Sequence, residues 1–243
     1  MRAFVVGALA LAACHPVAPR APAPVVALIS ANAEWTIVRE RYAAIPLQAG
    51  PYEWFVAELP GGAATFVHGG WGKVAAAAST QYVIDHFHPA LVVNLGTCGG
   101  FEGHAQAGDV ILARQTIIYD IVELMGDSRE AIADYATALD PARWPDRAHV
   151  RVETLVSADR DLAIDQIAGL AARYGAVAGD WESGEIAWVA ARNHTPVVIL
   201  RGVSDVVTAH GDVTYGDPGA FQRATRATMN DLLDRFAAAR AKL

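Results

Sequence analysis

The chain has 243 residues, of which 53% are hydrophobic, and this length suits one domain with a large core. Its formal charge of -7 at pH 7, with no basic run, argues against nucleic-acid binding, which needs a positive surface to meet phosphates. A small neutral or cationic ligand suits this composition better. The two cysteines, Cys14 and Cys98, are too few for a disulfide framework.

The first 13 residues are typical of a secretory signal peptide. A basic start is followed by an apolar run that is too short to span a bilayer, and then by Leu11-Ala12-Ala13-Cys14. This ending resembles the lipobox of bacterial lipoproteins, in which the cysteine carries the lipid. We therefore expect export, with Cys14 as the only membrane attachment. The alternatives are an ordinary buried strand or a mis-called start codon, and the latter implies a cytoplasmic protein.

After the signal, residues 14–24 contain four prolines among alanines, a composition that favours an extended tether. A domain of residues 25–243 is expected to follow. Short apolar runs predict buried strands, and apolar residues spaced three and four apart predict helices. The strands are 25–29, 91–95, 108–120, 152–156, 176–178 and 196–200, with a hairpin over 55–67; the helices are 35–41, 74–86, 162–174, one starting near 182, and 221–241. Residues 125–148 are expected to hold a helix and a surface loop.

Three acids follow the predicted strands or begin a helix. Glu34 follows strand 25–29, Glu182 lies at the start of a helix, and Asp205 follows strand 196–200. In an α/β sheet, ligands bind outside the carboxyl ends of the strands, so these acids are expected to share one cleft. Two acids facing one cleft can divide the roles of proton donor and anchor. Taken alone, Glu182 is equally explained as a first-turn acid and Asp205 as a cap or turn residue.

Two glycine-rich segments adjoin these elements. His68-Gly69-Gly70-Trp71-Gly72-Lys73 leads into helix 74–86 and would leave backbone donors free for an anion or a hydroxyl. Gly96-Thr97-Cys98-Gly99-Gly100 follows a strand and would let a substrate approach the backbone beside the Thr97 hydroxyl. The simpler explanation of the second segment is a tight turn that needs positive φ. Lys73 is either a ligand contact or a solvated residue at the start of a helix.

Taken in order, these segments resemble the nucleoside phosphorylase and nucleosidase superfamily, and within it most of all the methylthioadenosine/S-adenosylhomocysteine nucleosidases. The resemblance covers roughly residues 25–236. It implies a single α/β domain with a central mixed twisted sheet flanked by helices, a homodimer, and cleavage of the purine–ribose bond of a small nucleoside. No cofactor is implied, and the sequence offers no cluster with the spacing of metal ligands.

The resemblance also assigns roles to particular residues. Departing adenine needs a general acid at N7, and the attacking water needs a carboxylate base. The matched positions are Asp205 for the acid and Glu34 for the base, while Glu182 matches the glutamate that holds the ribose hydroxyls. Further substrate contacts are expected at Thr97 near the sugar, Trp181 in place of a methionine on the ribose face, Tyr215 as an aromatic lining residue, and Gly70, Gly99 and Ser204 within the matched motifs.

The sequence departs from the nucleosidases at the base. Asp161 stands where an aromatic residue normally stacks on adenine, so the identity of the base is left open. Loss of stacking would weaken base binding by about 1–3 kcal/mol unless Trp71 or another ring takes its place. Arg201 is either a structural ion-pair partner of acids or a ligand contact.

Phosphorolysis would need arginines to hold phosphate. Residues 30–34 contain none, and Asn94 occupies the second position at which hexameric phosphorylases carry one. Hydrolysis is therefore the first expectation. The alternatives are a phosphorylase that uses Arg39, Arg114 or Lys73 instead, and a lipid-anchored nucleoside-binding protein without turnover.

Overall fold

One mixed β-sheet organises the described chain, which comprises residues 23–208 and 217–243 of a computed structural model. Eight of its nine strands follow the order β2-β3-β1-β4-β8-β7-β5-β6, and the ninth, β9, pairs with both β4 and β5. The pairings β4-β8-β7-β5-β9 therefore return to β4 and close the centre of the sheet into a barrel. The strands are β1 Val25–Ile29, β2 Trp54–Leu59, β3 Gly62–His68, β4 Leu91–Phe101, β5 Val110–Ile118, β6 Ala136–Ala138, β7 Arg151–Ser157, β8 Ala176–Asp180 and β9 Val197–Val207.

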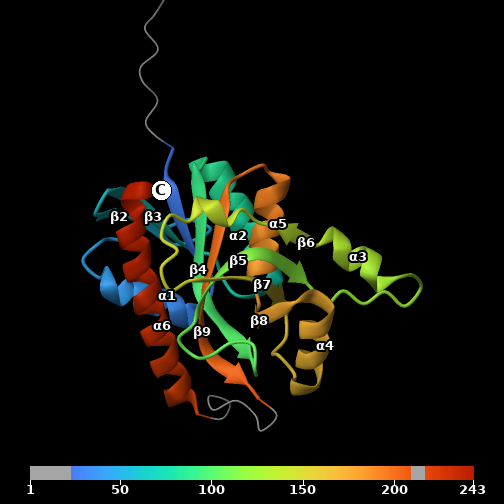
Figure 1. The fold of residues 1–243 in the computed structure, drawn as a ribbon. Coiled ribbons are helices and arrows are strands. Elements are labelled where there is room, and N and C mark those ends of the chain that lie inside the picture. Colours follow the sequence, from blue (N-terminus) through green and yellow to red (C-terminus); the bar gives the residue numbers. More distant parts are fainter. Residues whose placement is uncertain (1–22, 209–216) are drawn as a thin grey trace, which may run out of the picture.

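Helices flank the sheet, as the sequence predicted (Figure 1). They are α1 Asn32–Arg41, α2 Gly72–Phe87, α3 Ser128–Asp134, α4 Ile164–Tyr174, α5 Ser183–Arg192 and α6 Pro218–Ala239, with short 3-10 turns at Pro141–Arg143 and Arg240–Lys242. One core lies beneath α1 and α6 and includes Phe66 and Phe236. A second lies beneath α2 and α5 and includes Leu28 and Ile186. Among the described helices, none has both the length and the apolar character needed to cross a membrane.

Several predicted boundaries are wrong. The glycine-rich segment after residue 95 lies inside β4, and Asp205 lies inside β9 and not beyond the end of a strand. These two strands pair in parallel from Val92 opposite Val197 to Phe101 opposite Val207, so their hydrogen bonds carry both strands past the predicted ends. Glu34 lies in the first turn of α1, which starts at Asn32. The region 125–148 holds α3 but also β6, which pairs antiparallel with β5.

The explanation of a tight turn at residues 96–100 is also wrong. The glycines with positive φ do not include those at 96, 99 and 100, so this segment is extended backbone. Gly96 is needed for space. A Cβ at Gly96 would lie 2.1 Å from Nη1 of Arg201 and 3.0 Å from Oε1 of Glu34. The missing side chain of Gly96 therefore makes room for a buried guanidinium.

We expect Gly96→Ala to lower the free energy of unfolding by about 1–3 kcal/mol, because the buried Arg201 side chain must shift. Urea unfolding measures this change. The matched control is Gly169→Ala, within α4, where an added Cβ meets no atom within 4 Å. That variant is expected to gain up to about 1 kcal/mol from helix propensity. Equal stability of the Gly96→Ala and parent proteins would contradict the packing argument.

Candidate active site

A cavity of about 600 Å³ opens where several chain segments meet. Its walls come from the start of α1, the residue before α2, the end of β4, the loop after β7, the end of β8, the end of β9 and the start of α6. The predicted site residues that line it are Glu34, Thr97, Gly99, Trp181, Glu182, Ser204 and Asp205. Gly70 is not among the lining residues, and Tyr215 lies outside the described residues. The structure thus brings the three predicted acids into one cavity.

Glu34 is buried and held by three donors. Its Oε1 accepts from the backbone N–H and the hydroxyl of Thr97, at 2.6 and 2.9 Å, and its Oε2 accepts from the N–H of Ala31 at 3.2 Å. Burial raises the pKa of Glu34, while the charge of Arg201 and these hydrogen bonds act in the opposite direction. The Thr97 hydroxyl, expected beside the sugar, therefore donates to a carboxylate of the same chain.

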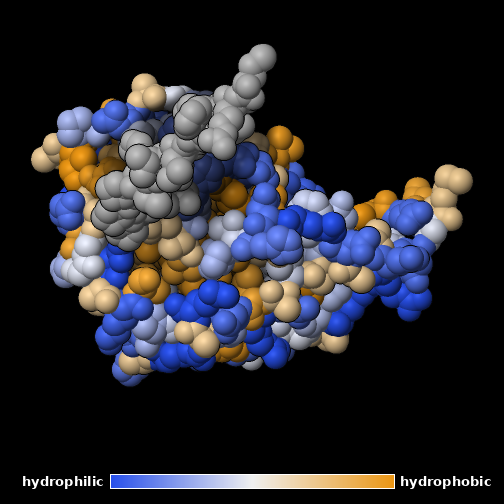
Figure 2. All heavy atoms as spheres, turned by 90° about the horizontal axis from the view of Figure 1, so that it is seen from above, coloured by the Kyte–Doolittle hydropathy of each residue, from blue (hydrophilic) through white to orange (hydrophobic). Residues whose placement is uncertain are grey.

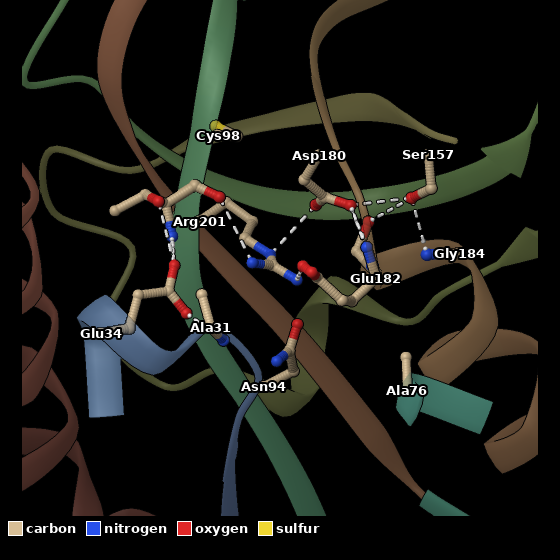
Figure 3. Close-up of polar contacts among 12 residues, drawn as sticks. Ala31, Glu34, Ala76, Asn94, Cys98, Ser157, Asp180, Glu182, Gly184 and Arg201 are labelled. Atoms are coloured by element: carbon tan, nitrogen blue, oxygen red, sulfur yellow. Dashed lines mark hydrogen bonds and ion pairs between the residues drawn. The ribbon is translucent and has the colours of Figure 1, made fainter. Parts of the chain in front are cut away.

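Arg201 is fully buried and does not line the cavity. Figure 3 shows its guanidinium between Glu34 on one side and Asp180 and Glu182 on the other. Its Nε is 3.0 Å from Oδ2 of Asp180, close enough for an ion pair although not aligned as a hydrogen bond. Its Nη2 is 3.5 Å from Oε2 of Glu182, and its Nη1 donates to the carbonyl of Thr97 at 3.3 Å. Burial alone would lower the pKa of Arg201, but the charges of Asp180 and Glu182 raise it. Of the two expectations for Arg201, the structure shows the ion-pair partner.

Asp180, to which the sequence assigned no role, connects Arg201 to the start of α5. Its Oδ1 accepts from the hydroxyl of Ser157 at 2.8 Å and from the N–H groups of Glu182 and Ser183 at 3.0 and 2.9 Å. The Ser157 oxygen in turn accepts from the N–H of Gly184 at 2.9 Å. Asp180 therefore satisfies the first amides of α5, which leaves the neighbouring carboxylate of Glu182 free for another role.

Glu182 precedes α5 but does not cap it. Its Oε1 accepts from the N–H of Gly72 at 3.2 Å. Burial raises the pKa of Glu182 to about 8; the charge of Arg201 opposes this, and the charges of Asp180 and Glu34 add to it. Since its side chain lines the cavity, the explanation of Glu182 as a simple first-turn acid is wrong.

The first amides of α2, expected to be free for an anion, are already used. The N–H of Gly72 donates to Glu182, and the N–H of Lys73 donates to Oδ1 of Asp159 at 2.7 Å. The Lys73 ammonium group is bound to both oxygens of Asp120 at 2.7 Å and does not line the cavity. Lys73 thus forms an ion pair at the start of α2, and its side chain is 27% exposed.

Asp205 lies near the end of β9 and lines the cavity. It is half-buried and accepts a hydrogen bond from the Ser204 hydroxyl. A Cβ at Gly99 would lie 3.4 Å from Oδ2 of Asp205 and 3.1 Å from Cδ1 of Leu162. The glycine thus leaves room beside the carboxylate, and Leu162 brings the loop after β7 over the same spot.

Three of the described residues that line the cavity are aromatic: Trp71, Trp181 and Phe221. The rings of Trp71 and Trp181 lie 5.2 Å apart at 32°, and both residues line the cavity. Asp161 also lines it, on the exposed loop after β7. An aromatic partner for a ligand is thus available in Trp71, although Asp161 replaces the ring expected from the resemblance.

A further buried acid, Glu185, lies in the first turn of α5 and was not singled out from the sequence. It is 5% exposed, and within the described chain neither carboxyl oxygen has a hydrogen-bond partner. Burial raises the pKa of Glu185 to about 8, and the charge of Asp180 adds to this while that of Lys73 opposes it. Glu185 does not line the cavity.

Comparison with known proteins shows the family to which the chain belongs. Residues 25–238 match the phosphorylase superfamily. The 5'-methylthioadenosine/S-adenosylhomocysteine nucleosidase of Marinomonas sp. (strain MWYL1) is 29% identical over 168 residues, which cover 63% of this chain and 73% of that protein. The chain therefore belongs to the phosphorylase superfamily, and the predicted family is confirmed.

Solved structures show the same fold. The Arabidopsis thaliana 5'-methylthioadenosine nucleosidase in apo form matches with a TM-score of 0.75 and 20% identity, covering 90% of this chain and 97% of that one. The Neisseria meningitidis 5'-methylthioadenosine/S-adenosylhomocysteine nucleosidase in complex with methylthio-immucillin-A matches with a TM-score of 0.69 and 22% identity, covering 90% and 99%. The predicted α/β fold with a central mixed sheet is thereby confirmed.

Glu185→Gln is expected to gain stability relative to the parent protein as the pH rises, by about 1 kcal/mol at pH 5 and by about 4 kcal/mol at pH 8. In the parent, unfolded Glu185 ionises near its ordinary value of 4.5, whereas the folded carboxyl keeps its proton up to about 8. The stability that its burial contributes is therefore fully present below pH 4.5 and is lost as the pH rises through 8. Urea unfolding at three pH values, with Glu58→Gln on the surface as control, measures the difference; parallel curves would contradict it.

Proposed function

We propose that this protein hydrolyses the N-glycosidic bond of an adenine-type purine nucleoside, with or without a 5′-thio substituent, and releases the free base and the ribose moiety. The observation that carries the proposal is the charge of the cavity. Its walls include five acids, and among the described lining residues only Arg160 is basic. Such a cavity stabilises an oxocarbenium-like sugar and repels phosphate. The acids are Glu34, Asp161, Asp180, Glu182 and Asp205.

Asp205 is proposed as the general acid. A purine leaves as a poor anion unless a proton reaches N7 while the glycosidic bond breaks. The space beside its Oδ2, kept open by Gly99, can receive the edge of the base. The Ser204 hydroxyl donates to Oδ1 and thereby orients the carboxyl group.

Glu34 is proposed as the general base that activates water on the other face of the sugar. The three donors from Thr97 and Ala31 fix the carboxylate, and its raised pKa makes it a stronger base than an exposed glutamate. Arg201 supplies the opposing charge that keeps the ionised form accessible. Thr97 acts here by holding the general base, Glu34.

Glu182 is proposed to bind the ribose hydroxyls. Its Oε1 is held by the Gly72 amide and its Oε2 by Arg201, so the carboxylate has a fixed direction at the cavity wall. A fixed acceptor reduces the entropy cost of orienting the sugar between acid and base. Trp181, beside Glu182, is proposed to pack on the ribose, and Trp71 to supply an aromatic surface for the ligand.

The alternative phosphorylase uses cations that this structure commits elsewhere. Arg39 donates to the carbonyls of Tyr42 and Ile45, and Lys73 is paired with Asp120. Neither these two residues nor Arg114 line the cavity. The α2 amides that would suit phosphate are already bound to carboxylates. These contacts favour water as the attacking nucleophile.

Asp205→Asn and Glu34→Gln are each expected to lower kcat at least about a hundredfold, because each removes a proton-transfer group. Release of free base from adenosine and from 5′-methylthioadenosine measures the rate. Glu58→Gln, on the exposed face of β2, is the matched control. Near-parental rates in both site variants would reject these assignments. Base release that requires phosphate and yields ribose 1-phosphate would support the phosphorylase, and nucleoside binding without base release would support the binding protein.

A homodimer is also proposed, because apolar side chains are exposed on two neighbouring segments. On α2, Val74 is 82% exposed, and Leu124 and Met125 on the segment before α3 are 92% and 100% exposed. The Lys73–Asp120 ion pair brings these two segments together. Figure 2 shows apolar surface on the projection at the right, the side that carries α3 in Figure 1. A second copy would bury this surface and border the cavity beside Trp71.

Light scattering is expected to give the mass of a dimer, and Val74→Asp combined with Leu124→Asp is expected to give a monomer, because charge in a buried contact is costly. Val56→Asp, on the partly exposed outer strand β2, is the matched control and is expected to remain dimeric. A parent protein that stays monomeric at tens of micromolar concentration would reject the dimer.

We further propose that residues 1–13 are a signal peptide, that Cys14 carries lipid, and that residues 14–24 tether the domain on the extracytoplasmic side of a bacterial membrane. The domain begins with β1, whose carboxyl end leads into Glu34, so the tether would join the amino end of β1, the end away from Glu34. Incorporation of labelled palmitate that Cys14→Ser abolishes and Cys98→Ser retains would support the anchor. Unlabelled protein in the cytoplasmic fraction would reject it.

A further inference from the structure

Three segments meet at the mouth of the cavity through one small network of charges. Oδ1 of Asp159 accepts from the N–H of Lys73 at 2.7 Å, and the N–H of Asp159 donates to Oδ2 of Asp120 at 3.2 Å. The Lys73 ammonium group closes the network on both oxygens of Asp120 at 2.7 Å. The start of α2, the segment after β5 and the loop after β7 are thereby joined to one another.

The network adjoins the carboxylate proposed to bind ribose. The N–H of Gly72 donates to Glu182, and the next amide along the chain donates to Asp159. Gly72 has φ of +82°, and a Cβ there would lie 2.9 Å from Oδ1 of Asp159. Two carboxylates thus hold consecutive amides of one turn whose positive φ favours glycine, so the position of the turn against Glu182 depends on Asp159.

The same loop also reaches the part of the cavity that Asp205 lines. Three residues after Asp159, Leu162 lies against Gly99, beside the carboxylate of Asp205. Both Asp161 and Leu162 line the cavity. The loop that carries Asp159 therefore also forms part of the cavity wall near Asp205.

We propose that Asp159 is a positioning residue for substrate binding, which acts by holding the turn at Gly72 and Lys73 against Glu182. The inference rests on the proposed role of Glu182 in holding ribose. Asp159 is exposed and does not line the cavity, so its effect passes through the backbone of α2. The effect of its removal should depend on the presence of the sugar hydroxyls that Glu182 binds.

The test compares adenosine with 2′-deoxyadenosine and 3′-deoxyadenosine as substrates of the same set of variants. Intrinsic reactivity of each nucleoside cancels when a variant is compared with the parent on that nucleoside. We expect Asp159→Asn to lower kcat/KM for adenosine about tenfold, mainly through KM. The relevant deoxynucleoside is the one on which Glu182→Gln has the smaller effect, because it lacks the hydroxyl that Glu182 binds. For that deoxynucleoside, Asp159→Asn should lower kcat/KM less than about twofold. Lys73→Met, which keeps the amide, should give an intermediate loss.

Asp165→Asn, an exposed acid in the first turn of α4, is the matched control and should be silent. Equal losses for Asp159→Asn on all three nucleosides would indicate a merely structural role for Asp159. This result would overturn the inference about Asp159 but not the proposed function. If Glu182→Gln shows no dependence on the hydroxyls, the ribose role of Glu182 and the inference both fail. A parent protein that releases no base would reject the proposed function itself.

Discussion

The site depends on one buried cation. Arg201 lies on β9 with no exposed surface, and a guanidinium in that position is stable only when acids surround it. Asp180 and Glu182 pair with it, and its charge also acts on Glu34. The acids come from the ends of different elements, so the charge of Arg201 is balanced only when α1, β8 and α5 pack beside β9. Gly96 completes this arrangement by leaving the space that the guanidinium fills.

The same balance determines the chemistry available to the cavity. Burial raises the pKa of Glu34 and Glu182, whereas Arg201 opposes that shift. A raised pKa makes the ionised form of a carboxyl group a stronger base, which suits the role of general base proposed for Glu34. Because the cation faces acids and does not line the cavity, the cavity itself remains acidic. An acidic cavity suits a sugar that develops positive charge.

Around Arg201, the backbone amides at two helix starts donate to carboxylates of the same chain. In other proteins, such amides often bind an anionic ligand. The amides at the start of α2 hold Glu182 and Asp159, and those at the start of α5 hold Asp180. A helix start attracts negative charge whether the charge belongs to a ligand or to a side chain. Here the side chains occupy it, and the helix starts become part of the wall that orients the site.

Local pattern determined much of this protein. Runs such as Val25–Ile29 show their strand character within a few residues, and the chain positions of Glu34, Glu182 and Asp205 relative to such runs already predicted one shared cavity. Only the tertiary structure decided the rest. Pairing of β4 with β9 carries both strands past their apolar runs, and Asp159 meets Lys73 across 86 residues of sequence while Lys73 meets Asp120 across 47. Such contacts depend on sheet register and on charge balance between distant segments, and neither is encoded within a local window.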